Sequence, residues 1–210
     1  MNRREAFKGL VALGTVALIP GAAFRYANSK PNLHFVGLGS GGTNTMWHIH
    51  QKGIEGIYTC FTGPYVSHLS NDVKHIYFEY PPELRMSNEI GRQRMPLTRE
   101  MRTVLSGDEH YVITVGLGAF SGTSLISDTL EFLEATNKSY LAVCTLPFKT
   151  EGRWRNEYAR QKMKELKNND KVLFSDQEQI KKIFEELSIL ETFEMADEQV
   201  FRIVKKHCLS

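Results

Sequence analysis

The chain has 210 residues, of which 41% are hydrophobic and 24% are charged, and its formal net charge is +2. This length is sufficient for one domain with a hydrophobic core, and the small net charge gives no indication of bulk electrostatic binding to nucleic acid. The three cysteines, Cys60, Cys144 and Cys208, are widely spaced and form no metal-binding pattern. Because Cys60 and Cys144 lie in apolar runs, we expect them to be buried.

The N-terminal segment has the features of an export signal. Arg3 and Arg4 come shortly before a short apolar stretch at 9–23, which is weakly hydrophobic and ends in Pro-Gly-Ala-Ala. This pattern resembles a twin-arginine signal with a signal-peptidase site. We expect residues 1–23 to be this signal or an anchor, 24–32 to be a linker, and 33–210 to be the folded domain. The protein would then be exported to the periplasm or held at the inner membrane, with a cytoplasmic location as the alternative.

Strands and helices alternate from residue 33 onwards, as judged from apolar runs and helical spacing. The strands are expected at 33–38, 56–61, 73–80, 111–117, 139–145 and 172–174. The helices are expected at 43–52, 90–105 (interrupted at Pro96), 123–136, 151–167, 177–187 and 193–207. This alternation predicts an α/β fold, with a mostly parallel sheet covered by helices on both faces.

Two glycine-rich turns connect a strand to a helix. The first turn is 37–44, after the first strand, and the second is 116–124, after the strand at 111–117. A strand, a glycine-rich turn and a helix N-terminus together direct backbone N–H groups and a helix dipole at a phosphate. Since ligands of open parallel sheets lie beyond the carboxyl ends of the strands, both turns would face one crevice. A di- or triphosphate fits this arrangement, and a tight turn without a ligand is the structural alternative.

A nicotinamide dinucleotide is the rival ligand. Gly37, Gly39 and Gly42 match the dinucleotide fingerprint. That fingerprint also requires an acidic residue at the end of the second strand, where this chain has 60–64, Cys-Phe-Thr-Gly-Pro. The dinucleotide also leaves the second glycine turn unexplained. An exported dinucleotide-binding oxidoreductase is therefore the third interpretation of this sequence.

Four segments of the chain resemble the N-terminal GTPase domain of the FtsZ/tubulin superfamily, on the FtsZ side. Residues 37–44 are similar to its first phosphate loop, and 116–124 are similar to its glycine-rich signature loop. The segment 147–155, Pro-Phe-Lys-Thr-Glu-Gly-Arg-Trp-Arg, matches the pattern Pro-Phe-x-x-Glu-Gly-x-x-Arg. Residues 176–197 align with the helix pair that closes over the base. The resemblance implies a three-layer, Rossmann-like fold that binds GTP or GDP, with Mg²⁺ as an accompanying ion.

The resemblance also implies individual ligand residues and no catalytic residue. Asn44 would face the nucleotide, Glu151 would hold the ribose, Arg155 would lie near the phosphates or sugar, and Phe193 would stack on guanine. Asp176 and Asp197 stand where the family usually has Asn; a carboxylate accepts from guanine N1–H and the exocyclic amine but cannot donate to O6. Glu151 and Arg155 are also four residues apart and would otherwise pair with each other. The phosphates would lie against Gly39, Ser40, Gly41, Gly42, Thr43, Gly118, Ser121, Gly122, Thr123 and Ser124.

The chain also departs from the family pattern. Phe120 replaces a glycine in the signature loop, and the terminal-phosphate loop at 81–86 has lost its glycines, although 88–91 still match. The sequence stops at the central helix, without the family's C-terminal domain and its acidic loop. We therefore expect hydrolysis to be slow or to depend on a protein partner that supplies the missing half. The alternative in a different class is an interaction module that kept the fold and lost the nucleotide.

Overall fold

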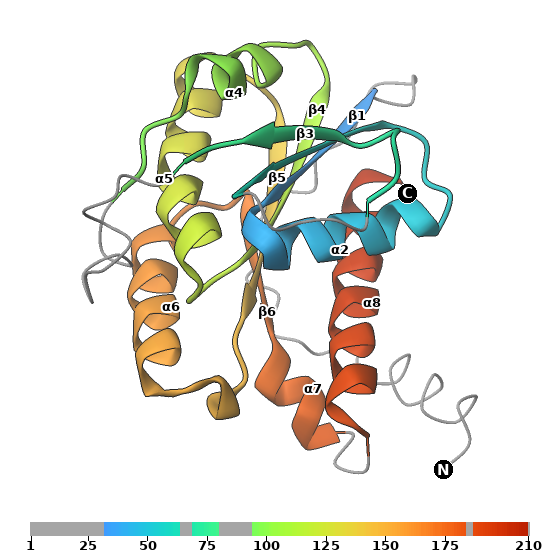
Figure 1. Ribbon diagram of the computed structural model, residues 1–210, viewed down its shortest axis with the longest axis vertical. Coiled ribbons are helices and arrows are strands. Elements are labelled where there is room, and N and C mark those ends of the chain that lie inside the picture. The colour runs from blue at the N-terminus through green and yellow to red at the C-terminus, as the bar shows by residue number, and fades with distance from the viewer. Residues whose placement is uncertain (1–31, 64–68, 80–93, 184–186, 210) are drawn as a thin grey trace.

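The computed structural model describes residues 32–63, 69–79, 94–183 and 187–209. Six parallel strands form one sheet in the order β3-β2-β1-β4-β5-β6 (Figure 1). The strands are β1 Leu33–Leu38, β2 Ile57–Thr62, β3 Lys74–Tyr77, β4 His110–Gly116, β5 Tyr140–Leu146 and β6 Val172–Asp176. The helices are α2 Gly39–Gln51, α4 Arg99–Val104, α5 Phe120–Ala135, α6 Arg153–Leu166, α7 Gln177–Ile183 and α8 Ile189–Cys208, with a 3-10 turn at Lys149–Glu151. This α/β architecture confirms the fold class predicted from the sequence.

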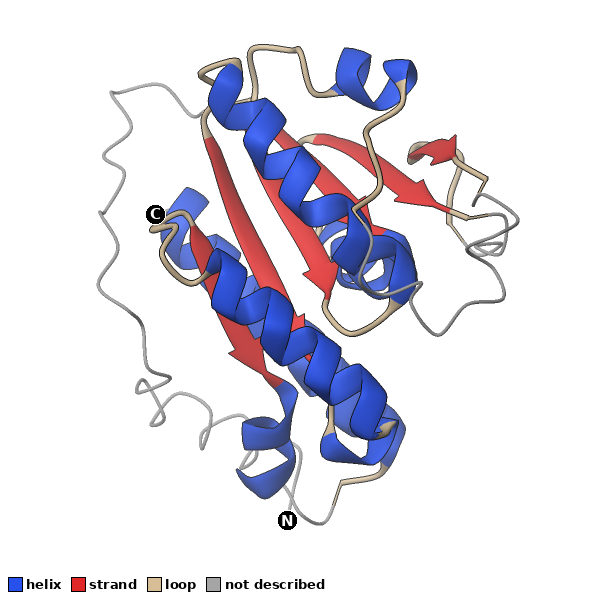
Figure 2. Ribbon diagram, turned by 90° about the vertical axis from the view of Figure 1, so that its left-hand side faces the viewer, coloured by secondary structure: helices blue, strands red, loops and turns tan. Residues whose placement is uncertain are grey.

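The sheet is covered on both faces, which explains why the central strands are apolar throughout (Figure 2). On one face, Phe35 of β1 and Val112 of β4 belong to a core cluster with residues of α2 and α8. The next residue of each strand, Val36 or Ile113, points to the opposite face and a second cluster that includes residues of α4, α5 and α6. No helix within the described ranges is long and apolar enough to cross a membrane.

Element boundaries differ from the predicted ones chiefly at helix starts. Helix α2 begins at Gly39 instead of residue 43, and α5 begins at Phe120 instead of residue 123. Gly39, Gly41 and Gly42 thus lie in the first turn of α2, and Gly122 lies in the first turn of α5, which the low helix propensity of glycine concealed in the sequence. Helix α8 begins at Ile189 because Ser188 caps it, with Glu191 completing a capping box, four residues before the predicted start.

Other boundaries also shift. The strand predicted at 73–80 is shorter, at Lys74–Tyr77. The helix predicted at 90–105 is described only as Arg99–Val104, where Thr98 caps it just after Pro96. The predicted signal at 1–23, most of the linker at 24–32, and the loop segments 81–86 and 88–91 lie outside the described residues.

Candidate functional site

The two glycine turns leave neighbouring strands at the centre of the sheet. Strands β1 and β4 pair in parallel, with Leu38 opposite Val115 at their carboxyl ends. From there the chain enters α2 on one face and α5 on the other (Figure 1). Strand order reverses between β1 and β4, so this is the topological switch point, where open α/β sheets bind ligands.

The first residues of the two helices touch through their backbones. Gly39 has a φ of +68°, and a Cβ on it would lie 2.7 Å from the backbone nitrogen of Gly122. A Cβ on Gly41 would lie 3.4 Å from the Cα of Gly116 in the second turn. Only glycine at 39 permits this approach, since any other residue would be strained and would collide with the second turn. The helix starts therefore form one continuous backbone surface.

Both helix starts lack side-chain caps. The residues that precede them, Leu38 and Ala119, make no capping hydrogen bond, and neither first turn contains an acidic residue. The first backbone N–H groups of a helix have no partner within the helix, and the helix dipole is positive there. Ser40, Gly41 and Asn44 of α2 are exposed at this edge. The combination is a site for an anion with several acceptor oxygens.

Two predicted site residues of the first turn are buried beneath it. A Cβ on Gly42 would overlap the carbonyl oxygen of Thr114 in β4, so Gly42 allows α2 to pack directly against the sheet. The Thr114 hydroxyl donates to the Gly42 carbonyl at 2.8 Å. Thr43 is also buried. Gly42 and Thr43 therefore lie on the side of the turn that faces the protein interior, while Ser40, Gly41 and Asn44 are exposed.

Hydroxyl groups hold the second turn together. The Thr123 hydroxyl accepts from the backbone N–H of Gly118 at 2.9 Å, and the Ser124 hydroxyl donates to the Ser121 carbonyl at 3.0 Å. Thr123 and Ser124 are both buried, so their side chains stabilise the turn's shape. Phe120, which replaces the family's glycine, is half-buried and packs against the core cluster on the α5 face.

At Gly118 the second turn packs closely against α6. Its φ is +90°, and a Cβ there would lie 2.6 Å from the carbonyl oxygen of Arg155. Glu151 accepts from the backbone N–H of Phe148 at 2.8 Å and pairs with the Arg155 guanidinium, also at 2.8 Å. The structure therefore has the Glu151–Arg155 pair that the four-residue spacing allowed. Phe193, 39% exposed, packs edge-on against Phe148 with ring centres 5.1 Å apart.

The two aspartates have different surroundings. Asp197 on α8 accepts from the Thr45 hydroxyl of α2 at 2.6 Å. Burial raises the pKa of Asp197, and the hydrogen bond from Thr45 and the nearby His48 oppose that rise. Asp176, at the end of β6, accepts from the backbone N–H of Glu178 at 3.0 Å and lines a hollow of about 180 Å³ between α6 and α7.

Sequence reasoning assigned no role to Thr45. It follows Asn44 in the helix and lies one turn after Gly41, so its spacing pointed to a packed helix position. Its partner Asp197 is more than 150 residues away in the sequence, and only the packing of α2 against α8 brings the two together.

No family model matches this chain, but individual curated proteins and solved structures do. The cell division protein FtsZ 1 of Thermococcus kodakarensis is 30% identical over 186 residues, which are 84% of this chain and 49% of that protein. The chain thus spans about half the length of the curated relatives it matches.

Two solved structures illustrate the likeness in fold. The empty FtsZ dimer of M. jannaschii superposes with a TM-score of 0.68 at 22% identity, covering 87% of this chain and 57% of that one. The GTPγS-bound protofilament of CetZ2 from Haloferax volcanii gives a TM-score of 0.57 at 17% identity, covering 82% and 57%. The chain therefore has the GTPase-domain fold of the FtsZ/tubulin superfamily.

Proposed function

We propose that this protein binds a guanine nucleotide, GTP or GDP, with its phosphates on the paired starts of α2 and α5. The observation that carries the proposal is the contact of two uncapped, acid-free helix starts at the switch point. A nucleoside di- or triphosphate supplies several anionic oxygens, which the backbone N–H groups of two helix starts can bind together. A single carboxylate or one phosphate would use only one of the two turns.

The remaining residues fit a sugar and a base. Glu151, already fixed by Phe148 and Arg155, would accept from the ribose hydroxyls. Asn44 and the exposed face of Phe193 would border the base, with Asp176 as a further contact. An ionised Asp197 would accept from guanine N1–H, whereas adenine presents only an acceptor at N1 and would be repelled. Selectivity for guanine over adenine follows from this difference.

Magnesium would be held chiefly by the nucleotide. The first turns of α2 and α5 carry no acidic residue, and the described parts of the chain contain no cluster of three or more His, Cys, Asp or Glu residues suited to a metal. Phosphate oxygens and water are the ligands that Mg²⁺ usually takes in such sites. The ion would neutralise phosphate charge, and the turns would orient the phosphates.

We extend the proposal to a protein partner at the nucleotide face. The structure of CetZ2 that shares this fold is described as a GTPγS-bound protofilament, which is an assembly of subunits. A subunit or a different protein that covers the crevice would exclude water from the phosphates and complete the site.

Calorimetric titration of the full chain with GDP, GTP, ATP and NADH tests the proposal. We expect dissociation constants in the micromolar range or below for GDP and GTP, which is about −8 kcal/mol or better. ATP should bind at least about tenfold more weakly. Binding of NADH without GDP or GTP would favour an oxidoreductase, and binding of none of the four would favour an interaction module; either result rejects the proposal.

A further inference from the structure

The Thr45 hydroxyl lies between the start of α2 and the side chain of Asp197. Its Oγ1 is 2.6 Å from Asp197 Oδ1 on α8 and 3.2 Å from the carbonyl oxygen of Gly41, one turn earlier on α2. Thr45 is 4% exposed, so water does not replace either acceptor easily. The side chain therefore touches both the candidate base contact and the candidate phosphate turn.

Thr45 has one hydroxyl proton for these two acceptors. A threonine within a helix commonly donates back to the carbonyl four residues earlier, which here is Gly41. A carboxylate is the stronger acceptor, and the shorter of the two distances is the one to Asp197. The hydrogen bond to Asp197 is therefore the stronger of the two, while the Gly41 carbonyl remains within reach as the second acceptor.

We propose that Thr45 is a positioning residue for the nucleotide, orienting Asp197 toward the base and coupling base binding to the first phosphate turn. The inference rests on the proposed function. When guanine N–H groups donate to Asp197, they compete with Thr45 for that carboxylate, and the Thr45 proton shifts toward Gly41. The Gly41 carbonyl then gains a hydrogen bond in the turn that holds the phosphates.

Thr45 also influences the pKa of Asp197. Burial of Asp197 favours the neutral acid, and the hydrogen bond from Thr45 favours the ionised form that accepts from guanine. His48 of α2 acts in the same direction when it is protonated. Glu198, the next residue of α8, is paired with Lys52 at 2.9 Å and Arg202 at 3.3 Å, and lies 3.4 Å from His48. Thr45 is thus an uncharged group that opposes the rise in the Asp197 pKa caused by burial.

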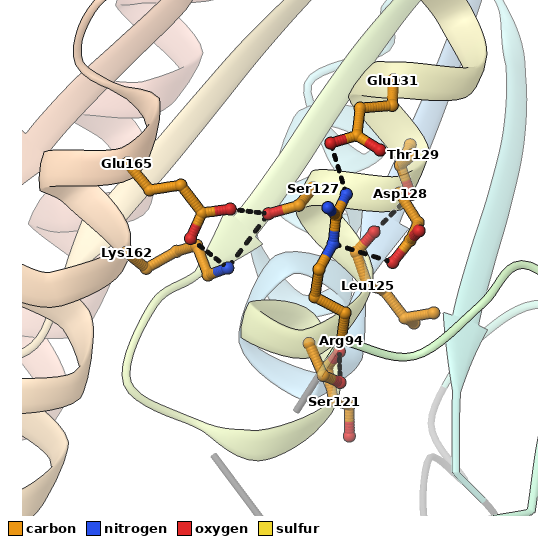
Figure 3. Close-up of polar contacts among 10 residues, drawn as sticks. Arg94, Ser121, Leu125, Ser127, Asp128, Thr129, Glu131, Lys162 and Glu165 are labelled. Atoms are coloured by element: carbon orange, nitrogen blue, oxygen red, sulfur yellow. Dashed lines mark hydrogen bonds and ion pairs between the residues drawn. The ribbon is translucent and has the colours of Figure 1, made fainter. Parts of the chain in front are cut away.

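The experiment compares Thr45→Val, which keeps the shape but loses the hydroxyl, with Thr45→Ser, which keeps the hydroxyl. Thr129→Val is the matched control, because Thr129 is a buried threonine on α5 that donates to the Leu125 carbonyl at 2.9 Å (Figure 3). The first measurement follows the Asp197 carboxyl by carbon NMR as a function of pH, without nucleotide. We expect its pKa to rise in Thr45→Val and to stay at the wild-type value in the other two variants.

The second measurement is the affinity for GDP as a function of pH. Thr45→Val should bind about tenfold more weakly or worse, and its pH profile should shift upward with the Asp197 pKa. Thr45→Ser and Thr129→Val should stay within about twofold of wild type. If Thr45→Val does not fold, Asp197→Asn serves instead, because an amide cannot ionise and should make GDP binding less dependent on pH than it is in the wild-type protein.

The outcomes separate the inference from the proposed function. An unchanged Asp197 pKa in Thr45→Val, or a shifted pKa with unchanged GDP affinity, overturns the role of Thr45 while the proposed function stands. For Asp197→Asn, a retained pH dependence of GDP binding has the same consequence. Wild-type protein that binds neither GDP nor GTP overturns the proposed function, and the positioning role with it.

Discussion

Neighbouring glycines of the first turn have opposite roles. Gly42 is buried against β4, where a Cβ would overlap the Thr114 carbonyl, whereas Gly41 is exposed and its Cβ would point toward Gly116 of the second turn. One glycine therefore permits the fold, and the other leaves the backbone exposed where the two turns meet. The sequence alone showed two equivalent glycines, because their difference arises from which side of α2 faces the sheet.

Matched alanine substitutions separate these roles. Gly42→Ala should lower the free energy of unfolding by more than about 2 kcal/mol, because α2 must move away from the sheet. Gly41→Ala should leave that free energy unchanged or raise it by about 0.5–1 kcal/mol, since alanine favours a helix over glycine. It should nevertheless weaken GDP binding, because the methyl group stands between the two turns. Urea denaturation and calorimetry measure the two effects; a stable Gly42→Ala protein would contradict this packing.

Two buried histidines should make the fold sensitive to acid. His34 and His110 are about 5% and 4% exposed, and burial lowers the pKa of each to about 4. The unfolded chain, with histidine pKa values near 6.5, binds more protons than the folded protein between these limits. Stability should therefore be full above about pH 6.5 and fall as the pH drops toward 4, by up to roughly 3 kcal/mol for each histidine.

Urea denaturation between pH 7.5 and 4 measures this loss. His110→Gln and His34→Gln should each make the free energy of unfolding less dependent on pH over this range. Equal slopes in the wild-type protein and both variants would show that other groups dominate the acid response.

Helices α5 and α6 are joined by a polar cluster in which Lys162 and Ser127 are buried and Glu165 is exposed. The Lys162 ammonium of α6 donates to the Ser127 hydroxyl of α5 at 3.0 Å and to Glu165 at 2.7 Å, and Ser127 donates to Glu165 at 2.7 Å (Figure 3). On the other side of Ser127, Arg94 pairs with Asp128 and Glu131 (Figure 3). The contacts of Ser127 with Lys162 and Glu165 fix α6, whose first turn carries Arg155, against the helix that begins with the second glycine turn.

Removing the Glu165 carboxylate should destabilise the fold more than removing the Lys162 charge that it pairs with. Glu165→Gln leaves the buried Lys162 ammonium without its counter-charge and, because water screens the exposed Glu165, should lower the free energy of unfolding by about 1 kcal/mol. Lys162→Met replaces that charge with an apolar side chain and should cost less. Glu157→Gln, in the exposed Arg153–Glu157 pair, is the control and should cost about 0.5 kcal/mol or less. A larger loss for Lys162→Met than for Glu165→Gln would contradict this ranking.

Periodicity predicted most of the elements, because strands buried on both faces and amphipathic helices leave clear patterns. The helix starts at Gly39 and Phe120 were missed, because glycine has a low helix propensity and Phe120 lies within a glycine-rich segment. The turns and the Glu151–Arg155 pair were accessible through local spacing. The Thr45–Asp197 contact was not, because it depends on how α2 packs against a helix at the other end of the chain.

At the scale of the whole molecule, the N-terminal segment predicts where the protein is found. We propose that Arg3, Arg4 and the apolar stretch after them direct the chain to the twin-arginine export route. Replacing both arginines by lysine in a reporter fusion should leave the reporter in the cytoplasm, while replacing Lys8 by arginine should not. A reporter that is exported equally well with the lysine pair, or that is never exported, would reject this location.

The central claim is that nucleotide phosphates lie on the joined starts of α2 and α5. Amide NMR spectra of the full chain, recorded during titration with GDP, test it most directly. The account predicts that the largest shifts occur at the backbone amides of 40–42 and 121–123, with smaller changes near Glu151 and Asp197. Shifts concentrated around the hollow lined by Lys149, Arg160 and Gln179, with the two turns unchanged, would contradict it.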